Sequence, residues 1–311
     1  MKLFQKIIIV TISIIALYSA FILMSDINTI YDKILNFKIE FIPIIFTMIF
    51  FGWFLLAIRW HLLLKNSDIN IPFRDNFFVY FSSFAFSFIP GEAGSLIKSQ
   101  ILKNKFNISR TKTTPIIIAE FTYTGIGLVF LSLFFGLFVF EYGIYVGSIF
   151  TCFLIIIFAI INSKKLFNVF LKISSKIKFL SGFTKSFEDS FDNIKKSTSG
   201  KIAIYSSLLS FSHLLIESSA VFLIIYAYGI ENIGIIEMIP MYSTSILLGF
   251  VSFLPLGMGV VEGALSTFLN LRGIEIAIAL PVVIIIRLMT NWFGIVLGAL
   301  ILKKYGGLRT K

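Results

Sequence analysis

The sequence predicts an all-α polytopic membrane protein, with six full transmembrane helices and two opposed re-entrant helical hairpins in an inverted-repeat arrangement. The chain of 311 residues is 57% hydrophobic and only 14% charged, so one soluble core cannot enclose its apolar side chains. The apolar runs extend for roughly 17–25 residues, the length that a helix needs to cross about 30 Å of hydrocarbon. They do not alternate polar and apolar residues as the strands of an outer-membrane barrel do.

Six apolar runs are long enough for full spans, namely residues 7–24, 41–64, 114–140, 142–161, 202–228 and 276–302. The first run follows Lys2 and Lys6 and could be taken for a signal peptide. It is long for a signal sequence and has no small-residue cleavage site near its end, so we interpret it as a retained span.

Two further apolar stretches are interrupted by proline and glycine. In the first stretch, residues 77–89 are followed by the break Pro90-Gly91-Glu92-Ala93-Gly94 and by a second apolar arm that ends at 102. In the second, residues 237–254 are followed by the break Pro255-Leu256-Gly257-Met258-Gly259 and by a second arm that ends at 269. Arms this short favour a helical hairpin that turns inside the membrane. Both breaks have Phe, an aliphatic residue, Pro, and then Gly four residues after the Pro. We therefore expect a single membrane domain over 1–311, with related halves of about 1–140 and about 202–311.

Positive charge is concentrated in one set of loops. With the N-terminus inside and each hairpin returning to the face it entered, 22 of the 27 Lys and Arg residues fall on the inner side, in residues 1–6, 65–74, 98–112, 163–201 and 303–311. This asymmetry predicts a multi-pass protein of the cytoplasmic membrane with cytoplasmic N- and C-termini. The first hairpin then enters from the cytoplasmic face and the second from the external face, as in transporters built from inverted repeats.

Residues 163–201 form a basic linker between the halves. Apolar residues recur in it at roughly helical spacing, at Leu166, Phe167, Phe170, Leu171, Ile177 and Leu180. We expect an amphipathic helix on the anionic inner leaflet, the alternative being a solvated linker that only follows the charge bias of inner loops. Charge of this kind indicates a membrane surface as the partner, and not a nucleic acid.

Eight ionisable residues fall within or beside the predicted membrane segments, where each charge requires a partner or water. They are Arg59, Glu92, Lys98, Glu120, His213, Glu217, Glu262 and Arg287. Glu92 and Glu262 could pair with the two arginines or accept protons during transport, and Glu120 and Glu217 could balance the charge or couple protons. Arg59 lies only six residues before Lys65, at the inner end of its span, so its side chain could alternatively extend to the inner membrane surface (snorkel). His213 and Glu217 are four residues apart, which suits a structural pair on one helix face.

Two further patterns indicate an inward-facing binding region. A helix that starts after Gly94 or Gly259 presents unpaired backbone N–H groups, which can bind an anion such as a lipid phosphate. Arg287 and Asn291 are four residues apart, and Gly294 and Gly298 continue the same stripe, so a neighbouring helix can approach closely there. The alternative is that proline and glycine only shape the hairpins and the charges only pair with one another.

Cysteine and histidine are scarce. The chain has one cysteine, Cys152, within an apolar run, and two histidines. No internal disulfide, metal site or cofactor is therefore expected.

Several of these motifs together resemble the lysylphosphatidylglycerol synthase transmembrane (flippase-like) family. The resemblance rests on Arg59-Trp60, residues 90–98 ending in Lys98, Glu120, residues 255–263 including Pro255, Gly257, Gly259 and Glu262, and Arg287 followed by Trp292 and Gly298. It covers almost the whole chain and implies a flippase for a phospholipid or a lipid-linked phosphate or glycan. In fused family members a cytosolic synthase domain supplies the lipid. Because no such domain is expected here, the resemblance implies no aminoacyl transfer.

The chain departs from the family pattern at three positions. Ser95 stands where the family usually has Glu, while Glu92 lies three residues earlier. Leu256 replaces the first glycine of the usual pair after the second proline, and Tyr123 replaces an acidic residue three positions after Glu120.

The leading hypothesis is a lipid translocase that holds a lipid phosphate between two opposed hairpins. The alternatives are a membrane enzyme acting on a lipid-linked sugar or phosphate, and a scaffold that recruits an envelope-synthesis enzyme through the basic linker. The expected partners are anionic or phosphate-bearing membrane lipids. The residues expected to bind the anion or balance its charge are Arg59, Pro90, Gly91, Glu92, Gly94, Lys98, Glu120, Glu217, Pro255, Gly257, Gly259, Glu262, Arg287 and Asn291.

Overall fold

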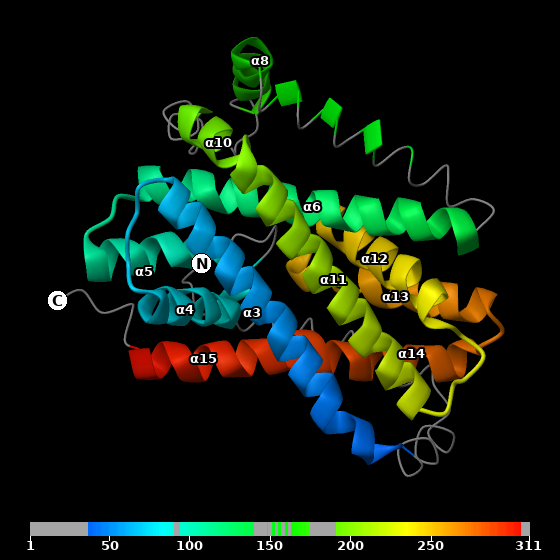
Figure 1. The fold of residues 1–311 in the computed structure, drawn as a ribbon. Coiled ribbons are helices and arrows are strands. Elements are labelled where there is room, and N and C mark those ends of the chain that lie inside the picture. Colours follow the sequence, from blue (N-terminus) through cyan, green and yellow to red (C-terminus); the bar gives the residue numbers. More distant parts are fainter. Residues whose placement is uncertain are drawn as a thin grey trace, which may run out of the picture.

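The computed structural model describes residues 37–89, 94–139, 148, 151–152, 155–156, 159–160, 163–174 and 191–305. Every regular element in these ranges is helical (Figure 1). The predicted span 7–24, most of the span 142–161, and the residues 90–93 of the first break lie outside the described residues.

Four of the six predicted spans are present as long apolar helices. They are α3 (Ile42–Asn66), α6 (Arg110–Val139), α11 (Lys201–Ala227), and a C-terminal span made of α14 (Ile276–Arg287), the π-helical turn η5 (Leu288–Trp292) and α15 (Phe293–Tyr305). Each is long and apolar enough to cross a bilayer. Their many Ile, Val and Phe residues favour strands in water, but in hydrocarbon every backbone hydrogen bond must be made internally, and a helix achieves this within one segment.

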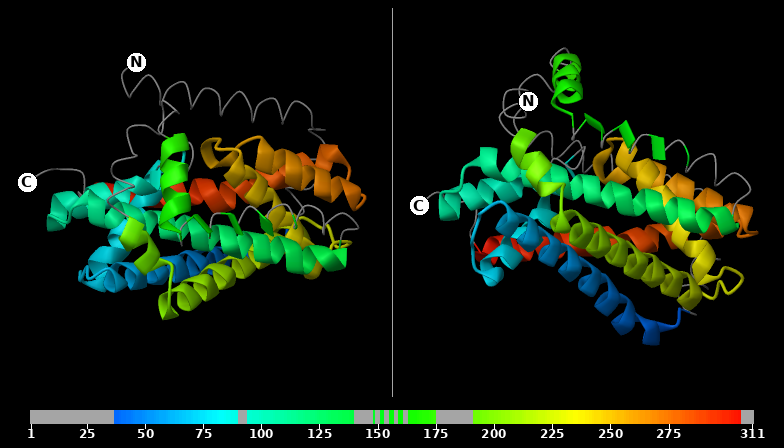
Figure 2. Two further views of the ribbon diagram at one scale, coloured as in Figure 1. Left: turned by 90° about the horizontal axis from the view of Figure 1, so that it is seen from above. Right: turned by 45° about the horizontal axis from the view of Figure 1, so that its top comes forward.

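Both interrupted stretches form pairs of short helices on either side of a break. The first consists of α4 (Phe73–Ser82), the 3-10 helix η2 (Ser83–Phe86) and α5 (Ile97–Phe106). The second consists of α12 (Ile235–Val251), the 3-10 turn η4 (Pro255–Gly257) and α13 (Val260–Leu271). Figures 1 and 2 show α4 and α5 at one end of the bundle, and α12 and α13 toward the other end.

The helices α3 and α11 form an antiparallel pair that organises the bundle. The Lys38 N–H before α3 donates to the Ala227 carbonyl at the end of α11 (3.0 Å), and Asn66 at the end of α3 donates to the Lys196 carbonyl before α11 (3.1 Å). The helix α6 packs against both α11 and α12, while α13 packs against α14. This arrangement brings faces of α3, α6 and α11 together in the interior.

The predicted stripe of small residues on the last span does permit a close approach. At Gly298 an added Cβ would lie 2.5 Å from the Ala85 backbone nitrogen and 2.8 Å from the Phe81 carbonyl oxygen. At Gly294 it would lie 3.2 Å from the Trp53 ring. Gly298 therefore lets α15 pack directly on the backbone of α4 and η2, and Gly294 leaves room for the Trp53 ring of α3.

A Gly298→Ala substitution is expected to lower stability by about 1–3 kcal/mol, because α15 must move away from the η2 backbone. The matched control is Gly263→Ala on α13, where an added Cβ meets no atom within 4 Å. Thermal unfolding of the two variants in mild detergent, followed by tryptophan fluorescence, measures the difference. Equal melting temperatures would show that α15 and η2 do not depend on this approach.

The two ends of the bundle carry different polar contacts. At the end where α3 finishes, Lys196 pairs with Asp68 (2.7 Å) and lowers the pKa of that carboxyl group by its hydrogen bond, while Tyr305 donates to Asp75 (3.0 Å). At the end where α3 begins, Lys38 pairs with Glu231 (3.0 Å), which raises the Lys38 pKa.

The basic linker is partly described, as two separate helices. Helix α8 (Lys164–Ser174) packs Phe167 and Leu171 against Phe191 and Ile194 of α10 (Phe191–Ser197). Its other face exposes apolar side chains, Leu166, Val169 and Phe170. Both views in Figure 2 show α8 lying across the direction of α6. Helix α8 therefore carries both packed and exposed apolar side chains, and its predicted place on the inner leaflet stays a prediction.

Candidate functional site

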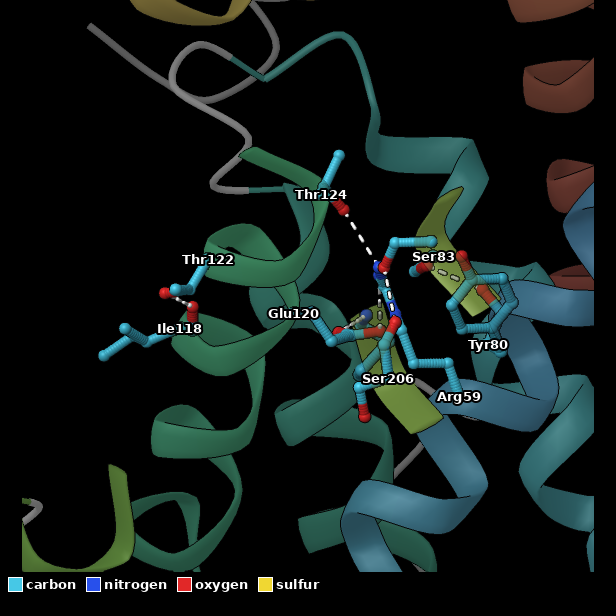
Figure 3. A network of polar contacts seen from close by, with 10 residues as sticks. Arg59, Tyr80, Ser83, Ile118, Glu120, Thr122, Thr124 and Ser206 are labelled. Atoms are coloured by element: carbon cyan, nitrogen blue, oxygen red, sulfur yellow. Dashed lines mark hydrogen bonds and ion pairs between the residues drawn. The ribbon is translucent and has the colours of Figure 1, made fainter. Parts of the chain in front are cut away.

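Arg59 lies inside the bundle and does not reach the surface. Arg59 is only 3% exposed. Its guanidinium donates hydrogen bonds to Thr124 Oγ1 (3.0 Å) on α6 and to Ser210 Oγ (2.6 Å) on α11. A carboxylate oxygen of Glu120 lies 3.6 Å from Arg59 Nη2. Figure 3 shows Glu120 and Thr124 of α6 both directed toward Arg59 of α3. The structure therefore supports inward pairing and not snorkelling.

Glu120 forms ion pairs with two basic side chains, Arg59 and Lys98. Its other carboxylate oxygen accepts a hydrogen bond from Lys98 Nζ of α5. The Lys98 ammonium also lies over the rings of Trp60 (4.4 Å) and Tyr80 (5.1 Å), where the negative ring faces stabilise it. Lys98 and Glu120 are each 3% exposed. We call Arg59, Lys98 and Glu120 the first ionic cluster.

A second ionic cluster is formed by Glu262 and Arg287 beside the second break. Glu262 is fully buried, and its Oε1 accepts a hydrogen bond from Arg287 Nε (2.9 Å). Its Oε2 accepts a hydrogen bond from the backbone N–H of Gly259 (2.6 Å), so it caps the start of α13. Arg287 also donates to the carbonyl oxygen of Leu256. One arginine on α14 thus fixes both the helix cap and the turn before it.

The turn at the second break requires an unusual backbone. Leu256, Gly257 and Gly259 have positive φ angles of 53°, 64° and 81°. Glycine adopts this region at little cost, whereas a leucine is strained in it. Gly257 also crosses Gly249 of α12 closely, because an added Cβ would lie 2.6 Å from the Gly249 Cα. The departure from the family pattern at Leu256 therefore falls on a position where glycine would be favoured.

The two clusters are related by an exchange of charge. In the first, the lysine is on the helix after the break (α5) and the carboxylate is on the following span (α6). In the second, the carboxylate is on the helix after the break (α13) and the arginine is on the following span (α14). The separations along the chain are similar, 22 and 25 residues. Each broken stretch is therefore tied to the next span by one buried ion pair.

Helix α11 joins the two clusters by a stripe of polar side chains. Ser210 contacts Arg59 in the first cluster, and His213 Nε2, one turn further, lies 3.4 Å from Glu217 Oε2. Glu217 is hydrogen-bonded to the Tyr242 hydroxyl of α12 and is close enough to Arg287 for electrostatic interaction. The polar path thus extends through the bundle from Arg59 to Arg287.

Other predicted site residues have less direct roles. Gly94 folds against the Phe86 carbonyl, which a Cβ would overlap, and Pro255 begins η4. Asn291 lies in the π-helical turn η5 and donates to Thr290 Oγ1 (3.1 Å). Pro90, Gly91 and Glu92 lie outside the described residues.

Tyr242 and Thr290 also belong to the second half of the polar path, but no pattern in the sequence identified them as candidate site residues. The Thr290 hydroxyl lies within hydrogen-bonding range of the Tyr242 oxygen, and both residues are buried. Single hydroxyl groups within apolar runs are common in spans, so only their position in the fold identifies them. Within the part of the chain that the structure describes, no group of three or more His, Cys, Asp or Glu residues could hold a metal ion.

The long apolar helices and the buried ion pairs define a multi-pass helical membrane protein with its charges turned inward onto two broken stretches. The chain belongs to the lysylphosphatidylglycerol synthase TM region family, whose family model matches residues 7–298. It is 29% identical over 222 residues to a UPF0104 membrane protein of Methanocaldococcus jannaschii, covering 68% of this chain and 89% of the relative. A UPF0104 membrane protein of Methanothermobacter thermautotrophicus is 26% identical over 147 residues, covering 47% of this chain and 41% of the relative. The family assignment made from the sequence is confirmed.

Proposed function

We propose that the protein is a lipid translocase that moves a phosphate-bearing lipid across the cytoplasmic membrane. The observation that carries this proposal is the polar path along α11, which joins two buried ionic clusters inside a bundle of apolar helices. Buried charges in a membrane are costly, and they are retained where a substrate or an ion passes. The family name, which includes a phosphate-bearing lipid, is in keeping with a lipid substrate.

The buried arginines are the groups best suited to a lipid phosphate. A guanidinium presents several N–H donors that match phosphate oxygens. Arg59 Nε is buried and makes no hydrogen bond within the described structure, so one donor of the first cluster is available to a ligand. The Gly259 N–H, in contrast, already donates to Glu262. We therefore assign the phosphate contact to the arginines and lysine, with the start of α13 closed by its own carboxylate.

Six spans and two opposed re-entrant hairpins are the architecture that suits this function best. The two broken stretches lie toward opposite ends of the bundle (Figure 1). Each is anchored to the next span by an ion pair, and the helix after the break supplies the cation in the first pair and the carboxylate in the second. We assign the end where α3 finishes to the cytoplasm, because Lys65, Lys105, Lys196 and Lys303 belong to it and inner loops are basic. The lipid tails would remain outside the bundle, where apolar side chains such as Phe130, Ile204 and Leu300 are exposed.

The test is translocation by the purified protein in phosphatidylcholine vesicles. Fluorescent NBD-labelled phosphatidylglycerol in the inner leaflet is protected from external dithionite until it crosses, so loss of fluorescence reports movement. NBD-labelled glucosylceramide, which has a sugar and no phosphate, is the matched probe. We expect phosphatidylglycerol to cross faster than in protein-free vesicles, and glucosylceramide to cross at the protein-free rate. Equal rates with and without protein would contradict translocation, and equal acceleration of both probes would contradict phosphate recognition.

A further inference from the structure

Glu217 differs from the other carboxylates inside the bundle in what surrounds it. Glu120 contacts Lys98 and Arg59, and Glu262 contacts Arg287, each within ion-pair distance. In the described structure Glu217 makes no such contact with a lysine or arginine. Its side chain is 15% exposed and meets His213 Nε2 at 3.4 Å and the hydroxyl of Tyr242.

These two partners suit both protonation states of a carboxyl group. The Tyr242 hydroxyl can donate a hydrogen bond to an ionised carboxylate. A protonated carboxyl group can instead donate its own hydrogen to His213 Nε2, because a neutral imidazole has one acceptor nitrogen. Protonation of Glu120 or Glu262 would break an ion pair with a lysine or an arginine. Glu217 has no such ion pair in the described structure. A proton can therefore bind and leave Glu217 without breaking an ion pair.

The charged and titratable groups around Glu217 come from every helix that packs on α11. His213 lies on α11 itself, Tyr242 on α12 and Arg287 on α14. Arg59 on α3 acts on His213 electrostatically, and Glu120 on α6 is turned toward Arg59. Arg287 favours the charged form of Glu217, while burial among apolar helices disfavours that charge. These two effects act on the charge of Glu217 in opposite directions.

We infer that Glu217 is a proton-binding site, with His213 and Tyr242 as its hydrogen-bond partners, that couples proton movement to translocation of the lipid phosphate. This inference rests on the proposed function. Proton binding removes a negative charge from the surroundings of Arg287, which makes that arginine a stronger site for a phosphate. By reciprocity, a bound phosphate favours the proton. The proton and the lipid phosphate are therefore carried in the same direction.

The π-helical turn η5 places the responding groups next to each other. Arg287 immediately precedes this turn, and Thr290 within it contacts Tyr242. An extra residue per turn is an irregularity that often occurs at functional positions in helices. A change of charge at Glu217 is thus transmitted through one tyrosine to the segment that carries Arg287.

Infrared difference spectroscopy tests the proton site without any requirement for lipid movement. Spectra of the purified protein at acidic and alkaline pH are subtracted, for the wild type and for Glu217→Gln and Tyr242→Phe. We expect a carbonyl stretching band of a protonated carboxyl group that titrates in the wild type, is absent in Glu217→Gln and is shifted in Tyr242→Phe. A band that persists unchanged in Glu217→Gln would overturn the assignment.

Translocation under an imposed proton gradient tests the coupling. In vesicles that contain a trapped pH-sensitive dye, the wild type is expected to move NBD-labelled phosphatidylglycerol several-fold faster toward the alkaline side than without a gradient, and to carry protons with it. Glu217→Gln should move the probe at a rate that does not depend on the gradient. Glu231→Gln, an exposed carboxylate at the end of the bundle, is the control and should behave as the wild type.

The outcomes separate the two proposals. Gradient-independent translocation by the wild type, or an unchanged gradient response in Glu217→Gln, would overturn the coupling and leave translocation established. No probe movement in any condition would overturn the proposed function, and with it the coupling, although the infrared band would still decide whether Glu217 binds a proton.

Discussion

A Glu120→Gln substitution is expected to destabilise the folded protein by about 4 kcal/mol and to abolish translocation of NBD-labelled phosphatidylglycerol. Glu120 is the carboxylate that contacts both Lys98 and Arg59, and all three residues are almost fully buried. Removal of one partner from a buried ion pair leaves the other charge uncompensated, which costs about 3–5 kcal/mol. Unfolding in mixed detergent micelles with increasing dodecyl sulfate, followed by tryptophan fluorescence, measures the loss.

The matched control for this substitution is Thr124→Val on the same helix. It removes the hydroxyl that accepts a hydrogen bond from Arg59 (3.0 Å) but leaves the charges of the cluster intact. A loss of about 1.5–3 kcal/mol is expected, the usual net contribution of one hydrogen bond to a charged group. If Glu120→Gln cost no more than Thr124→Val, the first ionic cluster would not be a buried ionic unit.

An Arg287→Gln substitution is expected to cost about 3 kcal/mol and to loosen the second break. The arginine contacts Glu262 (2.9 Å) and the Leu256 carbonyl, so its loss leaves a fully buried carboxylate without its basic partner. The Gly259 N–H still donates to Glu262, which moderates the cost. Hydrogen exchange measured by mass spectrometry should show faster exchange of the amides of 254–262 in the variant.

Arg272→Gln provides the comparison for Arg287→Gln. Arg272 also pairs with a glutamate, Glu237, at 3.1 Å, but both side chains are about one-third exposed at the end of the bundle. Pairs in such positions contribute about 0–1 kcal/mol, so this variant should unfold nearly as the wild type does. Equal exchange at 254–262 in both variants would show that Arg287 does not hold the break.

The helices and the breaks could be predicted from the sequence because their signals are local. A run of apolar residues about as long as the bilayer is thick has few structural alternatives, and proline followed by glycine marks where such a run ends. The small-residue stripe was similarly informative, since at Gly298 only glycine admits the backbone of η2 at that distance. The division of the last span into α14, η5 and α15 was not predicted, because a π-helical turn has no fixed composition.

The candidate site was predicted only in part, because its pairings depend on packing between distant segments. The sequence identified Lys98, Glu120, Glu262 and Arg287 as costly charges, but nothing local specifies which of them pair. The choice of partners follows from α5 packing on α6 and α13 packing on α14. Tyr242 was missed for the same reason, since its importance comes from the glutamate that faces it from α11.

Native mass spectrometry of the protein released from mild detergent tests most directly whether the buried cations bind a lipid phosphate. The wild type is expected to retain phosphate-bearing lipids, and a correctly folded Arg59→Gln variant is expected to lose most of them while Arg272→Gln retains them. A wild-type protein that carries no phosphate-bearing lipid, or an Arg59→Gln variant that retains the same lipids in the same proportion, would contradict the account.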